Sequence, residues 1–245
     1  MIKNKNCVYC GKEVRKSNNS DDGRSVEHLI PQIAVSKTRT NAQGDFHVCR
    51  KCNTEKSKID ELFGLLSRIN APGSSDGEAI SKLARMVNKK NKTVLSMVNS
   101  ATKHANGVEV KLPFKGGNIY KYGVFLTKGE YFKKHRSLLS ADNKIVLVTW
   151  GSPHLIKNLL SKYRAKHGTN LFEGLSQNAH VESIFDECFI IERNNGTEFL
   201  FIFNQSYLLI TKVVDDTENN KIEKRINIRA LIAGFSKNEK SKYCA

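Results

Sequence analysis

Long apolar runs are missing from this sequence. No stretch approaches the roughly 20 apolar residues that a membrane-spanning helix needs, and the opening residues, MIKNKNCVYC, contain no apolar core of the kind that a secretory signal requires. These absences argue against a membrane partner and against secretion. We therefore expect a protein of the cytoplasm.

Acidic residues are also comparatively few. The 245 residues include 24 Asp and Glu against 40 Lys and Arg, a formal charge of +16, with a sequence pI near 9.6. This balance favours a polyanionic partner over an acidic small substrate, with DNA first and RNA as the alternative. Residues 71–136 hold 13 basic and 4 acidic side chains and are the best candidate for following a phosphate backbone. Lysines that merely keep the protein soluble are the competing interpretation.

The cysteines are few and grouped, and disulfides are not expected because the cytosol keeps thiols reduced. Four of the six form two pairs, Cys7 with Cys10 and Cys49 with Cys52, each with two residues between them. This spacing is typical of a closed tetrahedral zinc site. The segment between the pairs is longer than in a simple zinc ribbon, so it holds an insertion. A structural zinc would stabilise a segment too small to form its own core.

The insertion contains SVEHLIPQ, where a carboxylate and an imidazole are adjacent in Glu27 and His28. In isolation such a pair is usually an exposed dipeptide without a function. Successive strand residues also point to opposite faces, so both side chains reach one site only if the strand is distorted there. Its position between two pairs of candidate zinc ligands makes this dipeptide a candidate for catalysis.

The order CVYC, EHLIPQ and FHVCRKCNTEK over residues 7–58 resembles the HNH, or ββα-metal, endonuclease family. This resemblance implies a zinc-fastened hairpin and helix that hydrolyse phosphodiester bonds with a divalent cation such as Mg²⁺ or Mn²⁺. It maps Glu27 and Asn53 to ligands of that cation and His28 to the general base. The chemistry fits, because phosphodiester hydrolysis needs a base for water and a cation for the developing charge. Neutral imidazole is a suitable base at physiological pH.

Two details depart from the commonest family pattern. The helix position is Asn53 and not His, and the middle residue that holds the catalytic imidazole has no clear counterpart. Asp45 is the first candidate for it, since carboxylates often orient imidazoles, and Asn41 is the second. His47 either joins the site or, more simply, packs against the cysteines. Lys51 and Lys56 are candidates for phosphate contacts, with a solvated helical face as the alternative.

The turn-forming stretch at 71–77 predicts a boundary between a nuclease domain at 1–70 and a second domain at 78–245. A helix is expected to leave the second cysteine pair, followed by one bent or two short helices across 80–101. Strands are expected at 108–114, 120–127 and 144–150, a helix near 154–167, and a three-stranded meander over 189–214. The predicted fold class is α+β, largely antiparallel in its second half.

The second half resembles no known family, and its expected role is selection of a target or partner. Aromatic and basic residues lie together at Tyr131, Phe132, Lys133, Lys134 and Arg136, which are candidates for nucleic-acid contacts. The leading hypothesis is a DNA endonuclease of restriction or phage defence. The alternatives are a non-catalytic zinc module that binds nucleic acid, and a nuclease subunit activated by another protein. A monomer with one site would nick, and cutting both strands would require a homodimer or two events.

Overall fold

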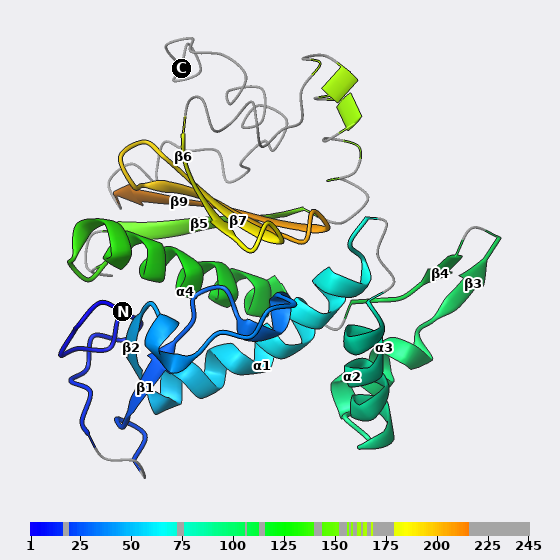
Figure 1. Cartoon of the computed structure of the whole chain (residues 1–245), viewed down its shortest axis with the longest axis horizontal. Helices are drawn as coiled ribbons and strands as arrows, with labels where there is room; N and C mark the ends of the chain where they lie inside the picture. The colour runs from blue at the N-terminus through cyan, green and yellow to red at the C-terminus, as the bar shows by residue number, and fades with distance from the viewer. Residues whose placement is uncertain are drawn as a thin grey trace.

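The computed structural model describes residues 1–16, 20–72, 76–105, 107–112, 116–139, 144–151 and 179–215, with short stretches between 156 and 168. Over these residues the chain is α+β, as predicted, with four α-helices and antiparallel sheets (Figure 1). Cys244 and much of the helix predicted near 154–167 lie outside the described residues.

A short hairpin and a long helix form the N-terminal part. β1 (Arg24–Glu27) pairs antiparallel with β2 (Phe46–Cys49), which places Glu27 opposite Phe46. Two 3₁₀ helices, η1 (Gln32–Ala34) and η2 (Asn41–Gln43), lie in the connection. α1 (Arg50–Ile69) begins directly after β2, as predicted. It buries a stripe of side chains at helical spacing, namely Ile59, Leu62, Phe63 and Leu66.

Two short helices follow, so the sequence between 80 and 101 forms two helices and not one bent helix. α2 (Gly77–Asn88) is capped by Asp76, whose carboxylate accepts the N–H of Ala79 at 2.9 Å. α3 (Lys92–Asn99) is capped in the same way by Asn91. A small antiparallel hairpin, β3 (Thr102–His104) and β4 (Gly107–Glu109), comes next and includes the start of the strand expected at 108–114.

The strand predicted at 120–127 is wrong, because this segment lies inside α4 (Gly116–His135). Its aromatic residues suggested a strand, yet the positions that the fold buries, Tyr122, Phe125, Leu126, Gly129 and Phe132, share one helical face. Tertiary packing of that face therefore outweighed the local preference of aromatic residues for strands.

The second half is built on a five-stranded antiparallel sheet in the order β5-β9-β8-β7-β6. The strands are β5 (Lys144–Gly151), β6 (His180–Ile184), β7 (Cys188–Arg193), β8 (Glu198–Phe203) and β9 (Tyr207–Asp215). The predicted meander over 189–214 is confirmed as β7, β8 and β9, and the sequence analysis missed β6. Asn194 and Asn195 turn the chain between β7 and β8 with positive φ angles, which asparagine tolerates well.

The sheet, α4 and α1 are arranged in layers, with α4 lying against one face of the sheet and α1 beyond it (Figure 1). Phe63 of α1 joins the layers, since its ring centroid lies 5.0 Å from that of Tyr122 in α4 and 4.9 Å from that of Phe203 in β8. A Cβ atom at Gly123 of α4 would lie 2.6 Å from a methyl carbon of Val148, so glycine allows α4 to approach β5 closely.

One apolar core runs through the described residues. It continues from Cys7 and Val48, before the predicted boundary at 71–77, to Phe203 and Leu209 beyond it. Whether residues 1–70 fold independently stays a prediction. Of the described helices, none combines the length and apolar character of a membrane span.

Candidate metal centre and the segment around His28

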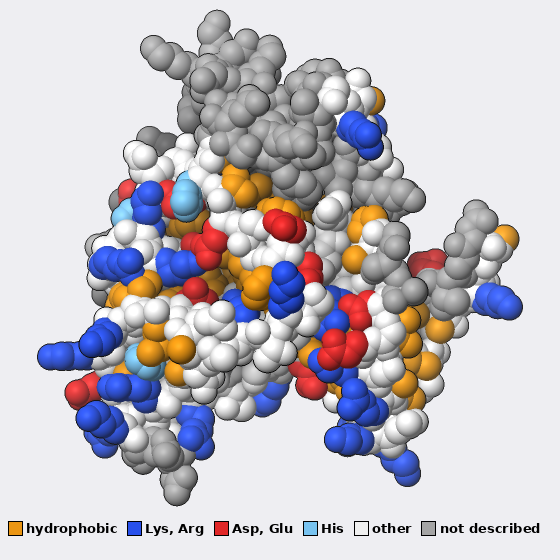
Figure 2. All heavy atoms as spheres, in the orientation of Figure 1, with side chains coloured by type: hydrophobic (Ala, Val, Ile, Leu, Met, Phe, Trp, Pro, Cys, Tyr) orange, Lys and Arg blue, Asp and Glu red, His pale blue; other side chains and the backbone are white. Residues whose placement is uncertain are grey.

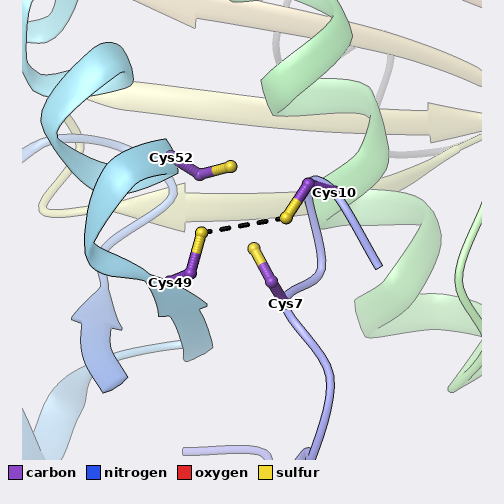
Figure 3. Close-up of side chains that lie close together, drawn as sticks. All are labelled: Cys7, Cys10, Cys49 and Cys52. Carbon is purple, nitrogen blue, oxygen red and sulfur yellow. Dashed lines mark hydrogen bonds between the residues drawn. The ribbon is translucent and has the colours of Figure 1, made fainter. Parts of the chain in front are cut away.

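Four cysteines converge at the N-terminal end of α1 (Figure 3). Cys7 and Cys10 come from an N-terminal loop, Cys49 ends β2, and Cys52 lies in the first turn of α1. Gly11, at a φ of 76°, donates its N–H to the Cys7 carbonyl at 2.8 Å and so closes the loop around the first pair. Cysteines about 40 residues apart in the sequence therefore lie together at the start of α1.

The sulfur geometry fits a metal ion. All four sulfurs lie within 4.8 Å of one another, and the Cys10 and Cys49 sulfurs are 3.7 Å apart. Four sulfurs at about 2.3 Å from a tetrahedral zinc would be separated by about 3.8 Å. A hydrogen bond from Cys52 lowers the pKa of the Cys7 thiol to about 5. This cluster can therefore hold a metal ion such as zinc, as the cysteine spacing predicted.

His28 directly follows β1, in a segment whose backbone is fixed by Asp45. The Asp45 N–H donates to the Glu27 carbonyl at 2.8 Å, and the Asp45 carboxylate accepts the N–H of Leu29 at 2.8 Å. Asp45 thus bonds the chain on both sides of His28. Asn41, the other candidate for the middle position, is exposed on η2. Of the two residues, Asp45 is the one in contact with the segment that carries the imidazole.

The His28 imidazole is half-buried and surrounded by charge. Its Nδ1 is buried and has no hydrogen-bond partner among the described residues. Burial lowers the pKa of His28, the positive charge of Arg39 lowers it further, and Asp45 acts in the opposite direction. The imidazole is therefore neutral near pH 7 and able to accept a proton.

Arg39 is a residue near His28 that the sequence analysis did not identify. Its guanidinium donates a hydrogen bond to the Ile30 carbonyl, and its Nε is buried without a partner in the described part of the chain. No carboxylate of the described residues forms an ion pair with it. Nothing in the local sequence marks this position, because the connection between β1 and β2 folds back to place it there.

Glu27 lies in the protein interior, with only 2% of its surface exposed. Its Oε1 is 2.9 Å from the Lys56 ammonium, which also contacts Asp60 at 2.8 Å. Burial raises the pKa of Glu27 to about 7, while the neighbouring Lys56 counteracts that rise. Its Oε2 is buried and unpartnered among the described residues. Glu27 is thus held by an internal lysine, and the Tyr9 hydroxyl interacts with the same carboxylate.

The burial of Lys56 corrects the expectation that this residue faces solvent or a phosphate. Its side chain is fully buried, whereas Lys51, five residues earlier in the same helix, is exposed. The cause is helical spacing, since Lys56 shares the inner face of α1 with Ile59, Asp60 and Phe63. Lys51 remains a candidate for a phosphate contact.

Asn53 lies between solvent and core on the first turns of α1. Its amide nitrogen donates to the Ser25 hydroxyl at 2.6 Å, which places it against the face of β1 that also carries Glu27. The bond uses nitrogen, so the amide oxygen remains as a ligand for a hard cation. His47, in contrast, pairs with Val26 in the strand register, and both therefore occupy the other face of the hairpin.

Lys133 and Lys134 of α4 are engaged with carboxylates. The Lys133 ammonium is 2.9 Å from Glu130, 2.6 Å from Glu182 and 3.7 Å from Asp45. Lys134 lies 2.8 Å from Glu192. Lys133 therefore links α4 to β6 and to Asp45, which fixes the His28 segment. The sequence had instead predicted that this lysine faces solvent and contacts a phosphate.

Two other residues of this group differ in exposure. Arg136 is exposed just after α4, whereas Phe132 is buried with its ring centroid 5.7 Å from that of Phe46. Arg136 stays a candidate contact, and Phe132 belongs to the core.

The chain has no match among protein-family models, curated proteins or solved structures. Within the described residues, the four cysteines are the only group of three or more His, Cys, Asp or Glu side chains placed to hold a metal ion. The candidate metal centre is accordingly the part of the predicted site that the structure shows.

Proposed function

We propose that this chain is a metal-dependent endonuclease that hydrolyses phosphodiester bonds of DNA, with His28 as the general base and a role in restriction or phage defence. The observation that carries the proposal is a half-buried imidazole directly after β1, in a hairpin that runs into a helix beside a cluster of four cysteines. Burial lowers the pKa of this imidazole, which suits a general base. This order of hairpin, base and helix fits the resemblance to HNH nucleases.

His28 would take the proton from the attacking water. Because its Nδ1 is buried, Nε2 is the ring nitrogen left to meet water. Asp45 acts as a positioning residue, since it holds the backbone on both sides of the imidazole. The guanidinium of Arg39 would hold a phosphate oxygen beside the base, as it has no carboxylate partner among the described residues.

Glu27 and Asn53 are the residues that would hold the catalytic cation. The unpartnered, buried Oε2 of Glu27 and the amide oxygen of Asn53 are the hard donors that Mg²⁺ or Mn²⁺ prefers. Such a cation stabilises the charge that develops on the phosphate and the leaving oxygen. Lys56 and the cation would then both contact the Glu27 carboxylate. Because both are positively charged, their repulsion favours movement of the Lys56 ammonium or of the Glu27 carboxylate.

The ion pair between Glu27 and Lys56 also supports a second candidate function. A protein that never binds a catalytic cation would keep this pair permanently, as expected for a zinc-containing module that only binds nucleic acid. A nuclease subunit that needs a partner protein would break the pair only when that partner binds. Both alternatives predict that the isolated chain does not cut DNA.

The decisive experiment is cleavage of supercoiled plasmid by the wild type, His28→Ala and the control His180→Ala, which removes an exposed imidazole from β6. Each protein is assayed with Mg²⁺, with Mn²⁺ and with EDTA. We expect metal-dependent nicking by the wild type and the control, and a rate lower by about 10²- to 10⁴-fold for His28→Ala, which is the usual contribution of a general base.

Bound zinc and the unfolding transition should be unchanged in His28→Ala, which separates loss of chemistry from loss of fold. Equal activity of His28→Ala and the wild type would exclude His28 as the base. No cutting by any of the three proteins would favour the binding module or the partner-dependent subunit.

A further inference from the structure

The helices α2 and α3 and the hairpin β3–β4 form a lobe that projects from the rest of the molecule (Figure 1). We propose that this lobe, residues 77–109, reads duplex DNA, with α3 in the major groove and the hairpin beside it. The inference extends the proposed nuclease function to target selection, but it depends on binding alone and is tested in a protein that lacks the catalytic base.

The connection between the two helices is short and tightly bonded. Only Lys89, Lys90 and Asn91 separate α2 from α3, and Lys90 adopts a left-handed conformation with φ of 55°. Asn91 donates its N–H to the Met86 carbonyl at 3.0 Å and caps α3 through its side chain. Two helices joined by a three-residue turn are the arrangement in which helix-turn-helix proteins present a second helix to the major groove.

The outward face of α3 carries side chains suited to base edges. Val94 and Met97 are buried against the core, whereas Lys92, Ser96 and Asn99 are exposed on the opposite side of the helix. Asn and Ser side chains both donate and accept hydrogen bonds, and Asn can bond adenine at two atoms in the major groove. The exposed face therefore combines a phosphate-binding charge with groups that distinguish bases.

The basic residues of the lobe differ from those of α4 in their partners. Lys89, Lys90 and Lys92 at the turn and Lys103 on β3 are exposed, and none of them pairs with a carboxylate of the described residues. Figure 2 shows Lys and Arg side chains at the outer ends of the lobe. Its acidic residues, in contrast, are occupied: Glu78 pairs with Lys82 at 2.7 Å, and Glu109 with His104 at 3.2 Å. The unpaired cations are thus free to contact phosphates.

The first test measures affinity for a duplex of about 30 base pairs, roughly three helical turns, by fluorescence anisotropy without added divalent cations. All proteins carry His28→Ala and differ only in surface charge. The lobe variant is Lys89→Gln, Lys90→Asn and Lys92→Gln, where Asn suits the positive φ of position 90. The control removes three exposed charges elsewhere with Lys58→Gln, Lys162→Gln and Arg164→Gln.

We expect the lobe variant to bind at least about tenfold more weakly near 100 mM salt. The slope of log affinity against log salt should be lower by two to three, because each lost phosphate contact contributes about 0.9. The control should retain most of its affinity and slope. An equal loss in both variants, or none in the lobe variant, would overturn the proposal and leave half-exposed Ile80 and Val98 as a candidate protein contact.

The second test separates reading of bases from attraction to phosphate. Selection from randomised duplexes with the His28→Ala protein should enrich a preferred sequence, and adding Ser96→Ala and Asn99→Ala should abolish that preference with the salt slope unchanged. Duplex RNA of equal length should compete poorly, since its major groove is too narrow for a helix. Equal competition by duplex RNA would overturn the placement of α3.

These binding results are independent of the nuclease. Lobe-dependent DNA binding together with an inactive wild type would support the DNA reader and refute catalysis by the isolated chain. Cleavage by the wild type, together with DNA binding that the lobe substitutions do not weaken, would support the nuclease and refute the DNA-reading lobe.

Discussion

At the scale of single residues, the interior of the N-terminal part depends on one buried lysine. Lys56 neutralises both Glu27 and Asp60, with contacts of 2.9 and 2.8 Å, and all three side chains are buried. Two carboxylates in the interior would repel each other without this ammonium group. Its Nζ also lies 5.7 Å from the ring centroid of Tyr122, so the same ammonium group contacts an aromatic ring of α4.

We predict that Lys56→Met lowers the free energy of unfolding by about 3–5 kcal/mol, because it leaves buried carboxylates without a counter-charge. Chemical denaturation measures this change. Lys58→Met is the matched control, since it removes an exposed lysine from the same helix and should stay within about 0.5 kcal/mol of the wild type. Equal stability of the two variants would show that the interior charge triad contributes little.

At the scale of elements, α4 connects the sheet with the segment that carries His28. Lys133 bonds Glu182 of β6 on one side and Asp45 on the other, and a Cβ atom at Gly129 would clash with the Leu29 side chain. The segment that carries His28 is therefore packed against α4 as closely as glycine allows.

Glu130 of α4 should make stability depend on pH. Burial raises its pKa to about 7, and Lys133 only partly offsets that rise. Between pH 4.5 and 7 the folded chain binds this proton more tightly than the unfolded chain does, so the contribution of Glu130 to stability falls as pH rises through that window. Relative to Glu130→Gln, the wild type should lose up to about 3 kcal/mol of unfolding free energy across it.

Unfolding free energies at pH 4.5 and pH 7 for the wild type and Glu130→Gln test this prediction. Glu61→Gln, which changes an exposed carboxyl on α1, is the control and should follow the wild type. A difference between wild type and Glu130→Gln that does not change with pH would contradict the raised pKa.

At the scale of the whole molecule, the candidate metal centre and the five-stranded sheet belong to one apolar core. Tyr9, between Cys7 and Cys10, has its ring centroid 4.8 Å from that of Phe125 in α4 and 6.0 Å from that of Phe46 in β2. Lys128 of α4 also donates to the Tyr9 carbonyl at 2.7 Å. The loop that carries two of the four cysteines thus packs directly against α4.

We predict that Cys49→Ser loses the bound metal and lowers the melting temperature of the whole chain in one transition, because the cysteine loop and α4 share a core. Metal analysis and calorimetry measure the two effects. Cys188→Ser is the control, since this buried cysteine lies outside the cluster and its loss should leave metal content unchanged. A separate, early transition in Cys49→Ser would instead indicate an independent domain at residues 1–70.

The sequence predicted helices and strands best where the residue pattern fitted only one type of secondary structure. The stripe from Ile59 to Leu66 predicted α1, and the asparagine and glycine turns predicted β7, β8 and β9. It failed at 120–127, where aromatic residues fit a strand as well as a helix. The intrinsic preferences of these residues could not distinguish a helix from a strand there, because the outcome depends on packing against the five-stranded sheet.

The candidate site divides in the same way. The four cysteines were identified from sequence because metal-ligand spacing is a local property. His28 was singled out because it stands between the two cysteine pairs, and its role stays a prediction. Arg39, Lys133 and the partners of Lys56 could not be found from sequence, since their roles depend on contacts between residues far apart along the chain.

The sequence alone therefore determined the soft metal-binding donor set, the excess of positive charge and most regular elements, which are properties of residue type and short-range spacing. Only the tertiary structure decided which of the basic side chains are free. It buries Lys56 and pairs Lys133 with carboxylates, yet it leaves Lys89, Lys90 and Lys92 exposed. The reason is physical: a lysine has the same charge wherever it stands, but desolvation and neighbouring carboxylates, which only folding brings together, determine what that charge can bind.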